Sequence, residues 1–329
     1  MIMQRKYFFN ISVLLMVLLL LNACQDEEYT LPEAKTNFQN DVIKRNLGPN
    51  LIGLNMEFAY AMALPADKGK IVSAQVEASI DGAAGTYLEN KSYYTNGSGV
   101  DVGIPVGGAS VTEGKITRVD FTRDTSATTL RYYYVIPEAA RGQSVTFKFS
   151  ANSSNGETVS YSMGPYTIAK MDMKLDLAVK DADACYISIA DMAVYKATEA
   201  AANAGKIDLV YLYRTTPAAF AHALVSPAAD PQYLPGVTLP AGVNRSAKIS
   251  KAWALRDQQL ARLQFGVFID DPDFKELNIA DAPNFAINLK AESGVWVETT
   301  DGKYRAYIYV NSVDNTTKSA RISIKRYAL

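Results

Sequence analysis

The feature that most constrains the fold of this chain is the recurrence of short segments in which apolar and polar residues alternate. In RYYYVIP, for example, Arg131, Tyr133 and Val135 fall on one face of an extended strand, and the intervening residues fall on the other. Between such segments lie clusters such as ADKGK, DGAAG, TNGSG and SSNGE, in which Gly, Asn, Asp and Ser supply the conformations that turns need. A chain with this pattern is predicted to be mostly β.

The alternating segments of residues 31–170 are short, and polar turns separate them. Several short strands with this spacing are typical of an all-β sandwich. Residues 31–170 are therefore predicted to form an N-terminal immunoglobulin-like β-sandwich. Its expected strands are Ile52–Ala63, Val72–Ile80, Thr117–Thr122, Leu130–Ile136, Ser144–Ala151 and Val159–Ile168.

Residues 171–329 mix helix-forming and strand-forming patterns. The segment SIADMAVYKATEAAANAG contains many helix formers, and the strand-like KIDLVYLYR follows it. A helical turn is expected at Pro217–Leu224, and LRDQQLARLQFGVFIDD indicates a short helix followed by a strand that ends at Asp270. Four alternating segments close the chain, and TTDGKY between two of them is an Asp-Gly hairpin signal. This part is predicted to be a ligand-binding α+β domain with a largely antiparallel sheet.

Residues 1–23 have the form of a secretory signal. Arg5 and Lys6 precede an apolar stretch that is shorter than the roughly 20 residues of a membrane-spanning helix. The sequence LNAC, which ends at Cys24, resembles a bacterial lipobox, in which the signal is cleaved before the cysteine and the cysteine is acylated. Several acyl chains on one residue give a stable membrane anchor. The alternative is an ordinary secretory signal with an incidental cysteine.

The chain turns abruptly acidic after Cys24. In one interpretation, residues 24–30 are a solvated tether whose charge and low hydrophobicity prevent packing. In the other, which we favour, the run resembles the export signal that sends Bacteroidetes lipoproteins to the outer face of the outer membrane. The protein is then predicted to face the cell exterior. The residues of this export signal are Gln25, Asp26, Glu27 and Glu28.

Charge and residue counts exclude several kinds of function. Without residues 1–23, the chain keeps 31 of its 33 basic residues and all 34 acidic ones, a net charge of −3, so nucleic acid is not an expected partner. With Cys24 acylated, Cys185 has no intramolecular disulfide partner and is expected to be a small buried hydrophobe. The single histidine, His222, excludes a zinc site built from several histidines. No cofactor is predicted.

An aromatic surface in the C-terminal part is the predicted ligand site. The chain holds 20 tyrosines, and this residue combines a large apolar face with a polar tip. In KYRAYIYVN, alternate side chains share one strand face, which is compatible with an exposed surface on which sugar rings stack. In the alternative interpretation, the tyrosines fill the core or pair across strands. The predicted glycan-binding residues are Trp253, Trp296, Arg305, Tyr307 and Tyr309.

The acidic segment FIDDPDFKE suggests a second kind of chemistry. Asp270, Asp271 and Asp273 are weak candidates for Ca²⁺ ligands, because the segment lacks the fixed glycine and terminal glutamate of an EF-hand. A turn before a short helix explains the same acids without a metal, and no metal site is predicted. A glycoside hydrolase needs two carboxylates roughly 5–10 Å apart across the sugar, and no local motif pairs two of them. The protein is predicted not to be an enzyme.

Several stretches, including CYISIADMAVY, IDLVYLYR, HALVSPAA and GVWVETTDGKYRAYIYVNSV, resemble a family of two-domain Bacteroidetes outer-surface lipoproteins of uncharacterised function. Members of that family resemble the accessory lipoproteins encoded beside outer-membrane glycan-uptake systems. The resemblance implies glycan capture at the outer surface, and it brings no catalytic residues. The leading prediction is a non-catalytic, lipid-anchored carbohydrate-binding protein whose partners are the outer membrane, a glycan and an uptake complex. The alternatives are a structural or adhesive, fimbria-like lipoprotein and a glycoside hydrolase.

Overall fold

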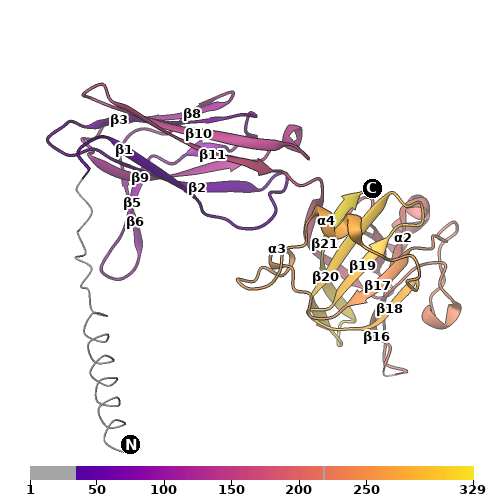
Figure 1. The fold of residues 1–329 in the computed structure, drawn as a ribbon. Coiled ribbons are helices and arrows are strands. Elements are labelled where there is room, and N and C mark those ends of the chain that lie inside the picture. Colours follow the sequence, from indigo (N-terminus) through magenta and orange to yellow (C-terminus); the bar gives the residue numbers. More distant parts are fainter. Residues whose placement is uncertain (1–34, 218) are drawn as a thin grey trace, which may run out of the picture. The chain divides into compact units, whose positions relative to one another are not determined.

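The computed structural model describes residues 35–217 and 219–329, and strands dominate this part of the chain (Figure 1). An N-terminal sandwich precedes a C-terminal domain whose first strand begins at Asp172. The paired strands of both domains run antiparallel. The predicted fold class, a mostly β chain with an N-terminal sandwich followed by an α+β domain with largely antiparallel pairing, is confirmed. The predicted signal, tether and export signal, with Cys24, lie outside the described residues.

The N-terminal domain consists of two sheets and a separate hairpin. The four-stranded sheet has the order β1 (Gln39–Lys44), β2 (Asn55–Ala63), β9 (Ala127–Val135) and β4 (Tyr87–Leu88). The five-stranded sheet has the order β11 (Thr158–Thr167), β10 (Ser144–Ser153), β3 (Ile71–Ala78), β8 (Ile116–Asp120) and β7 (Val111–Glu113). The hairpin consists of β5 (Lys91–Thr95) and β6 (Asp101–Pro105), and the 3₁₀ turn η1 (Glu138–Ala140) precedes β10.

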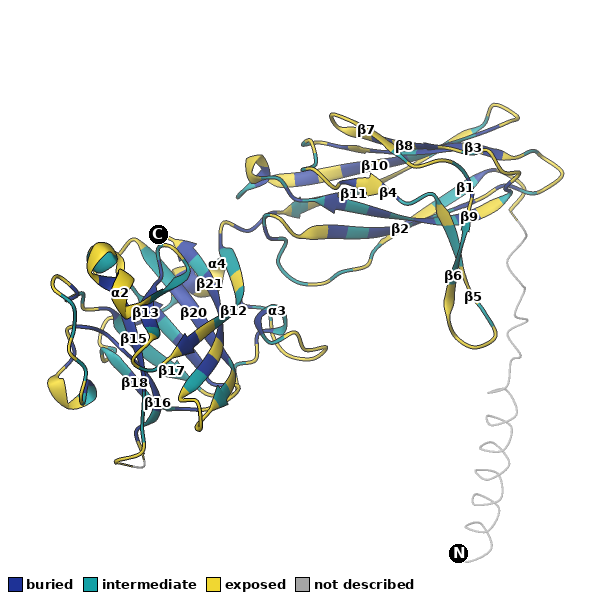
Figure 2. Ribbon diagram, turned by 180° about the vertical axis from the view of Figure 1, so that it is seen from behind, coloured by how far each residue is buried: buried dark blue, intermediate teal, exposed yellow. Residues whose placement is uncertain are grey.

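Aromatic side chains from both sheets fill the sandwich core. Phe58 of β2 and its ladder partner Tyr132 of β9 are buried, and the ring centroid of Phe58 lies 4.9 Å from that of Phe147 and 5.4 Å from that of Phe149 on β10. Aromatic pairs at such distances stabilise the core beyond the burial of their apolar area. Buried and partly exposed residues alternate along β9 (Figure 2), which confirms the two faces predicted for RYYYVIP.

The C-terminal domain contains two five-stranded sheets. The first has the order β12 (Asp172–Lys180), β21 (Ser319–Ala328), β20 (Tyr304–Asp314), β19 (Gly294–Glu298) and β17 (Lys248–Ala252). The second has the order β14 (Ala193–Lys196), β13 (Ala184–Ser188), β15 (Leu209–Arg214), β16 (Ala221–Val225) and β18 (Phe285–Leu289). The helices are α2 (Ala197–Ala200), η2 (Ala201–Lys206), η3 (Pro231–Tyr233), α3 (Gln258–Ala261) and α4 (Asp271–Glu276). Within the described residues, no helix has the length and apolar character that a membrane crossing requires.

Two layers of apolar packing surround the first sheet of this domain. On one face, residues such as Ile308 of β20 share a core with the second sheet. On the opposite face, Tyr307 of β20 packs with Leu260 and Phe274, which belong to residues 253–283 between β17 and β18. This segment carries α3 and α4, and we call it the covering segment. The first sheet is therefore buried on both faces near β20.

One local prediction in this domain is wrong and another is confirmed. The helical turn predicted at Pro217–Leu224 is replaced by β16, where Ala221 pairs with Arg214 of β15. Pairing within the sheet satisfies backbone groups that a single helical turn leaves open, so tertiary context decides this segment. The hairpin predicted at TTDGKY joins β19 to β20, and Gly302 adopts the positive φ of 63° that such a turn needs.

Candidate functional site

The structure buries the two tyrosines of the predicted aromatic platform. Tyr307 and Tyr309 of β20 are 0% and 3% exposed, because the covering segment packs against their face of the sheet. Their rings cannot stack on a sugar, so the prediction of an exposed strand face is wrong for both residues. Alternation identifies side chains that share a face, but it does not show what covers that face.

The other three residues of the predicted platform have separate surroundings. Trp296 is partly buried in the same cluster as the two tyrosines. Arg305 forms an ion pair with Glu298, with 2.9 Å between Nε and Oε2, and its Nη1 donates to the carbonyls of Phe274 and Lys275 in α4. Trp253 is 58% exposed, and the Lys251 ammonium lies 4.0 Å from its ring centroid. Of the five predicted residues, Trp253 alone offers a largely exposed ring.

A fully buried ion pair ties the covering segment to the sheet. Lys325 Nζ of β21 lies 2.6 Å from Asp257 Oδ2, and both side chains are 0% exposed. The Asp257 carboxylate also accepts hydrogen bonds from the backbone N–H groups of Leu260 (2.9 Å) and Ile269 (2.7 Å), and Lys325 donates to the Ile269 carbonyl. Burial lowers the pKa of Lys325, and the charge of Asp257 opposes this shift. Polar contacts as well as apolar packing thus keep the platform tyrosines covered.

The three acids considered as Ca²⁺ ligands accept backbone hydrogen bonds. Asp270 caps α4 by accepting from the Asp271 N–H (2.7 Å), and the Asp273 carboxylate accepts from the Asp270 N–H (2.7 Å). The Asp271 carboxylate accepts from the N–H groups of Lys170 and Met171. Asp270 therefore starts a helix, and the strand predicted to end there is absent from the described structure. Among the residues described, no group of three or more His, Cys, Asp or Glu is arranged to hold a metal ion.

A partly exposed aromatic surface lies on the outer face of the four-stranded sheet of the sandwich, where Tyr87 is exposed and Tyr133 is half-buried. Tyr87 of β4 and Tyr133 of β9 are ladder partners, and their rings stack with centroids 4.8 Å apart and planes inclined by 16°. Tyr87 is 43% exposed, whereas the next residue, Leu88, points into the core. Glu57 of β2 is the ladder partner of Tyr133 on its other side. One row of side chains therefore crosses three strands.

Polar side chains frame this tyrosine pair. Arg131 shares a strand face with Tyr133, lies with its guanidinium 3.9 Å from the Tyr93 ring centroid, and forms an ion pair with Asp101 (2.6 Å) on β6. The Tyr93 hydroxyl donates to the Glu89 carboxylate, and this hydrogen bond, together with burial, raises the pKa of Tyr93 to about 12. We call the following set the tyrosine face: Glu57, Tyr87, Tyr93, Arg131 and Tyr133.

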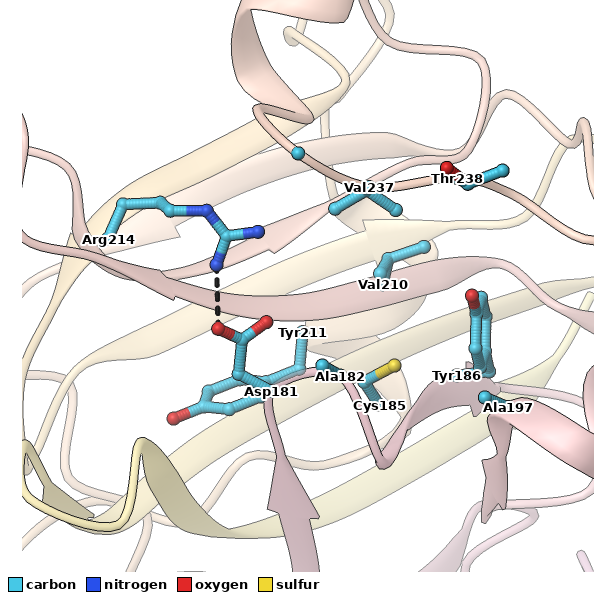
Figure 3. Close-up of a pocket in the computed structure, with 11 residues that line it drawn as sticks. Asp181, Ala182, Cys185, Tyr186, Ala197, Val210, Tyr211, Arg214, Val237 and Thr238 are labelled. Atoms are coloured by element: carbon cyan, nitrogen blue, oxygen red, sulfur yellow. Dashed lines mark hydrogen bonds and ion pairs between the residues drawn. The ribbon is translucent and has the colours of Figure 1, made fainter.

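A separate cavity of about 180 Å³ lies in the C-terminal domain (Figure 3). Arg214 and Asp181 stand at one end of it, Tyr186 and Thr238 stand at the other, and Cys185 lies between them. We call this cavity the Arg214 pocket. The rest of its lining is mostly apolar and consists of Ala182, Ala197, Val210, Tyr211, Gly236 and Val237.

Backbone carbonyls fix the ion pair of the Arg214 pocket. Arg214 Nη1 lies 2.6 Å from Asp181 Oδ2 and also donates to the Tyr213 carbonyl (2.7 Å), while Nε donates to the Pro235 carbonyl (2.8 Å). The two side chains are 23% and 10% exposed. Burial raises the pKa of the Cys185 thiol to about 11, so the sulfur is protonated at neutral pH and is a poor nucleophile. The pocket has room for a small ligand, but its cysteine is not activated for catalysis.

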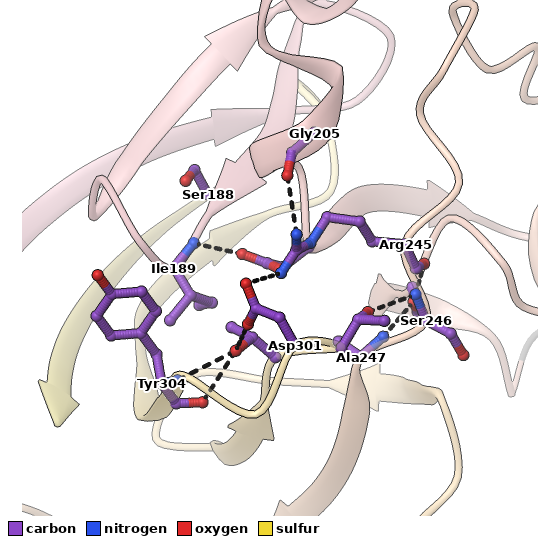
Figure 4. A network of polar contacts seen from close by, with 12 residues as sticks. Ser188, Ile189, Gly205, Arg245, Ser246, Ala247, Asp301 and Tyr304 are labelled. Carbon is purple, nitrogen blue, oxygen red and sulfur yellow. Dashed lines mark hydrogen bonds and ion pairs between the residues drawn. The ribbon is translucent and has the colours of Figure 1, made fainter. Parts of the chain in front are cut away.

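In a second polar network of this domain, one arginine, Arg245, pairs with two carboxylates (Figure 4). Asp208 is 1% exposed and accepts hydrogen bonds from Arg245 Nε (2.8 Å) and from the Ile189 N–H (2.9 Å). Arg245 also donates to the Gly205 carbonyl (2.8 Å) and lies 3.3 Å from Asp301 Oδ2. Burial raises the pKa of Asp208, and the neighbouring guanidinium opposes that shift. Because both oxygens of Asp208 are occupied, this network joins segments of the fold and presents no free carboxylate to a ligand.

The single histidine also has both of its polar atoms occupied. His222 of β16 is 2% exposed, with Nδ1 2.6 Å from the Tyr211 hydroxyl and Nε2 2.8 Å from Asn315 Oδ1. Burial lowers the pKa of His222 below its usual value, so the imidazole is neutral at neutral pH. A neutral, buried ring with two protein partners has a structural role.

Both domains match families of unknown function. A family model described as domain of unknown function DUF4466 matches residues 35–168, and one described as DUF8576 matches residues 169–329. A crystal structure of a DUF4466 family protein from the Bacteroidetes species Parabacteroides merdae is 44% identical, with a TM-score of 0.83, over 89% of this chain and 99% of that chain. BcpA, the major pilin subunit of Bacillus cereus, matches with 10% identity and a TM-score of 0.29, over 87% of this chain and 66% of that chain. No curated protein matches the chain.

Proposed function

This chain belongs to the DUF4466 family, and we propose that it is a lipid-anchored, non-catalytic protein of the cell surface that binds glycan. The single observation that carries this proposal is the tyrosine face. A pyranose presents C–H groups on its faces and hydroxyls at its rim, so it fits an exposed aromatic ring beside charged hydrogen-bonding groups. Tyr87 and Tyr133 supply the rings, and Glu57 and Arg131 supply the charged groups. The proposed site thereby moves from the C-terminal domain to the sandwich.

Anchoring at the cell surface is part of the same proposal. Acylated Cys24 would hold the protein at the outer membrane, and the acidic residues that follow would direct it to the outer face. There the tyrosine face could collect glycan for an outer-membrane uptake complex. Cys24→Ala should abolish labelling with radioactive palmitate and move the protein from the membrane fraction to the soluble fraction. Continued labelling of the variant would contradict lipidation at this residue.

Affinity gel electrophoresis against host, plant and microbial polysaccharides tests glycan binding with soluble protein that starts at Gln25. At least one polysaccharide should retard the protein, and Tyr87→Ala and Tyr133→Ala should each remove the retardation. Tyr94→Ala is the matched control. Tyr94 is 52% exposed and follows Tyr93 on β5, so its side chain points to the opposite face of that strand from the tyrosine face. Retardation by no polysaccharide, or equal retardation of all variants, would refute the proposed site.

A structural role in surface assembly is the second candidate, and β11 is the observation that favours it. This ten-residue strand lies at the edge of the five-stranded sheet, and most of its residues are exposed. An exposed sheet edge can pair with a strand of another chain. If the glycan screen is negative, replacing Ser162 of β11 by proline should weaken self-association measured by sedimentation, because proline cannot donate to such a ladder.

A further inference from the structure

We propose that the Arg214 pocket is a second ligand site, which binds a single sugar residue through two adjacent hydroxyl groups. The site lies in the C-terminal domain and shares no residue with the tyrosine face. Many compounds carry adjacent hydroxyls, and we name a sugar because the proposed function is glycan binding. The capacity to hold a neutral pair of hydroxyls rests on the pocket itself.

The size of the cavity fits a small ligand. Its volume of about 180 Å³ is far above the roughly 10–15 Å³ of cavity that one water molecule requires. Pockets for drug-sized ligands are larger, at about 300–1,000 Å³. One pyranose ring matches the smaller size class, and a disaccharide does not. The pocket therefore accommodates a single residue at the end of a glycan or a free monosaccharide.

The ion pair at one end of the pocket leaves one nitrogen of Arg214 and one oxygen of Asp181 without a partner among the described residues. Arg214 uses Nη1 and Nε, and no acceptor among the described residues engages its Nη2. Asp181 uses Oδ2, and no donor in the described part of the chain reaches its Oδ1. Both side chains are partly exposed, and neither Nη2 nor Oδ1 is sealed from water, so hydroxyls of a ligand can reach the two atoms. Two neighbouring hydroxyls complete the arrangement, because one can donate to Oδ1 while the other accepts from Nη2.

The rest of the lining favours a neutral ligand and binding without hydrolysis. The charges of Asp181 and Arg214 neutralise each other, so a carboxylate or an amine would find no free counter-charge. At the far end, the hydroxyls of Tyr186 and Thr238 can bond further sugar hydroxyls (Figure 3), and Val237 presents an apolar surface to ring C–H groups. The lining contains one carboxylate, whereas glycoside hydrolysis commonly uses two.

Isothermal titration calorimetry with methyl pyranosides and their deoxy analogues tests the site on the protein that starts at Gln25. At least one methyl pyranoside with adjacent free hydroxyls should bind, and removal of either hydroxyl should weaken binding about tenfold or more. Asp181→Asn removes the charged acceptor with little change in size and should weaken binding by a similar factor. Ala197→Phe, at an exposed position of α2 beside the pocket, should block it without disturbing the ion pair. Lys206→Ala, which breaks a solvent-exposed ion pair outside the lining, is the control.

Three results would overturn the inference. These are binding of no methyl pyranoside, wild-type affinity in both Asp181→Asn and Ala197→Phe, and preferential binding of a carboxylate or an amine. The two proposed sites can fail independently. Tyr87→Ala should leave methyl pyranoside binding unchanged, and Ala197→Phe should leave polysaccharide retardation unchanged. If the pocket binds a methyl pyranoside but the tyrosine face binds no polysaccharide, this inference stands and the site proposed on the sandwich is refuted.

Discussion

Replacing Asp257 by asparagine should destabilise the C-terminal domain by about 3–5 kcal/mol, the cost of breaking a buried ion pair. Asp257→Asn keeps the size of the side chain but removes the negative charge 2.6 Å from Lys325 Nζ. Because Lys325 is 0% exposed, water cannot replace the lost partner. The amide oxygen can accept from the N–H of Leu260 or of Ile269, and the other N–H loses its acceptor. In a domain of this size, the melting temperature should fall by roughly 6–20 °C.

Tryptophan fluorescence can follow the unfolding of this domain selectively. The chain has two tryptophans, Trp253 and Trp296, and both belong to the C-terminal domain. Urea and thermal unfolding followed by tryptophan emission therefore report on this domain, even where the sandwich unfolds in a separate transition. The midpoint and the urea dependence of the free energy of unfolding give the difference between the variant and the wild-type chain.

Two controls separate the lost charge from altered packing. The double variant Asp257→Asn/Lys325→Met removes both charges and should recover most of the stability, because a buried pair replaced by uncharged groups costs little. In the single variant, burial keeps the pKa of Lys325 in the folded chain below the usual 10.5 of the unfolded chain. At a pH between the folded and unfolded pKa, the unfolded chain binds more protons than the folded chain, so stability rises with pH. A single variant that melts with the wild-type chain, or a double variant no more stable than the single one, would refute the reasoning.

Two further substitutions probe other buried contacts of this domain in the same unfolding assay. In Gly294→Ala, the new methyl group would overlap the Tyr307 hydroxyl, which should cost about 1–3 kcal/mol of stability. In Gly205→Ala, no atom lies within 4 Å of the new methyl group, so this variant should not be destabilised. Equal unfolding midpoints for the two variants would contradict this reasoning. Since burial lowers the pKa of His222 from 6.5, the unfolded chain alone gains a proton below about pH 6.5, and stability should fall there. His222→Gln should flatten this pH dependence, and an unchanged slope would show that other groups cause it.

Strands could be predicted from the sequence because alternation is a property of each strand by itself. The two faces of RYYYVIP and the hairpin at TTDGKY required no knowledge of distant residues, and both are confirmed. The exposure of Tyr307 and Tyr309 depends on the covering segment, which follows β17 by an irregular path that no periodicity specifies. Sequence patterning therefore predicted which side chains share a face, but not which face stays open to solvent.

Neither candidate site has a signature in the sequence. Tyr87 lies in a two-residue strand, which is too short to show alternation, and only the ladder places it beside Tyr133. Arg214 ends β15, whereas Asp181 follows β12 in the other sheet of the same domain. Their contact depends on how the two sheets pack, because neither local pattern encodes the other residue. Both sites result from tertiary pairing between segments that look like ordinary strands and turns.

Two buried aspartates of the C-terminal domain, Asp257 and Asp208, differ from the partly exposed Asp181 in how far the protein itself satisfies them. Asp257 and Asp208 use both carboxylate oxygens for protein partners, whereas Asp181 uses one of its two for Arg214. A buried carboxylate is costly unless it is hydrogen-bonded, so stability favours the closed arrangement at Asp257 and Asp208, whereas water can reach the second oxygen of Asp181. A hydroxyl group of a ligand can take the place of that water. Asp181→Asn should therefore lower the melting temperature less than Asp257→Asn or Asp208→Asn, and an equal or larger loss would mark Asp181 as a structural residue.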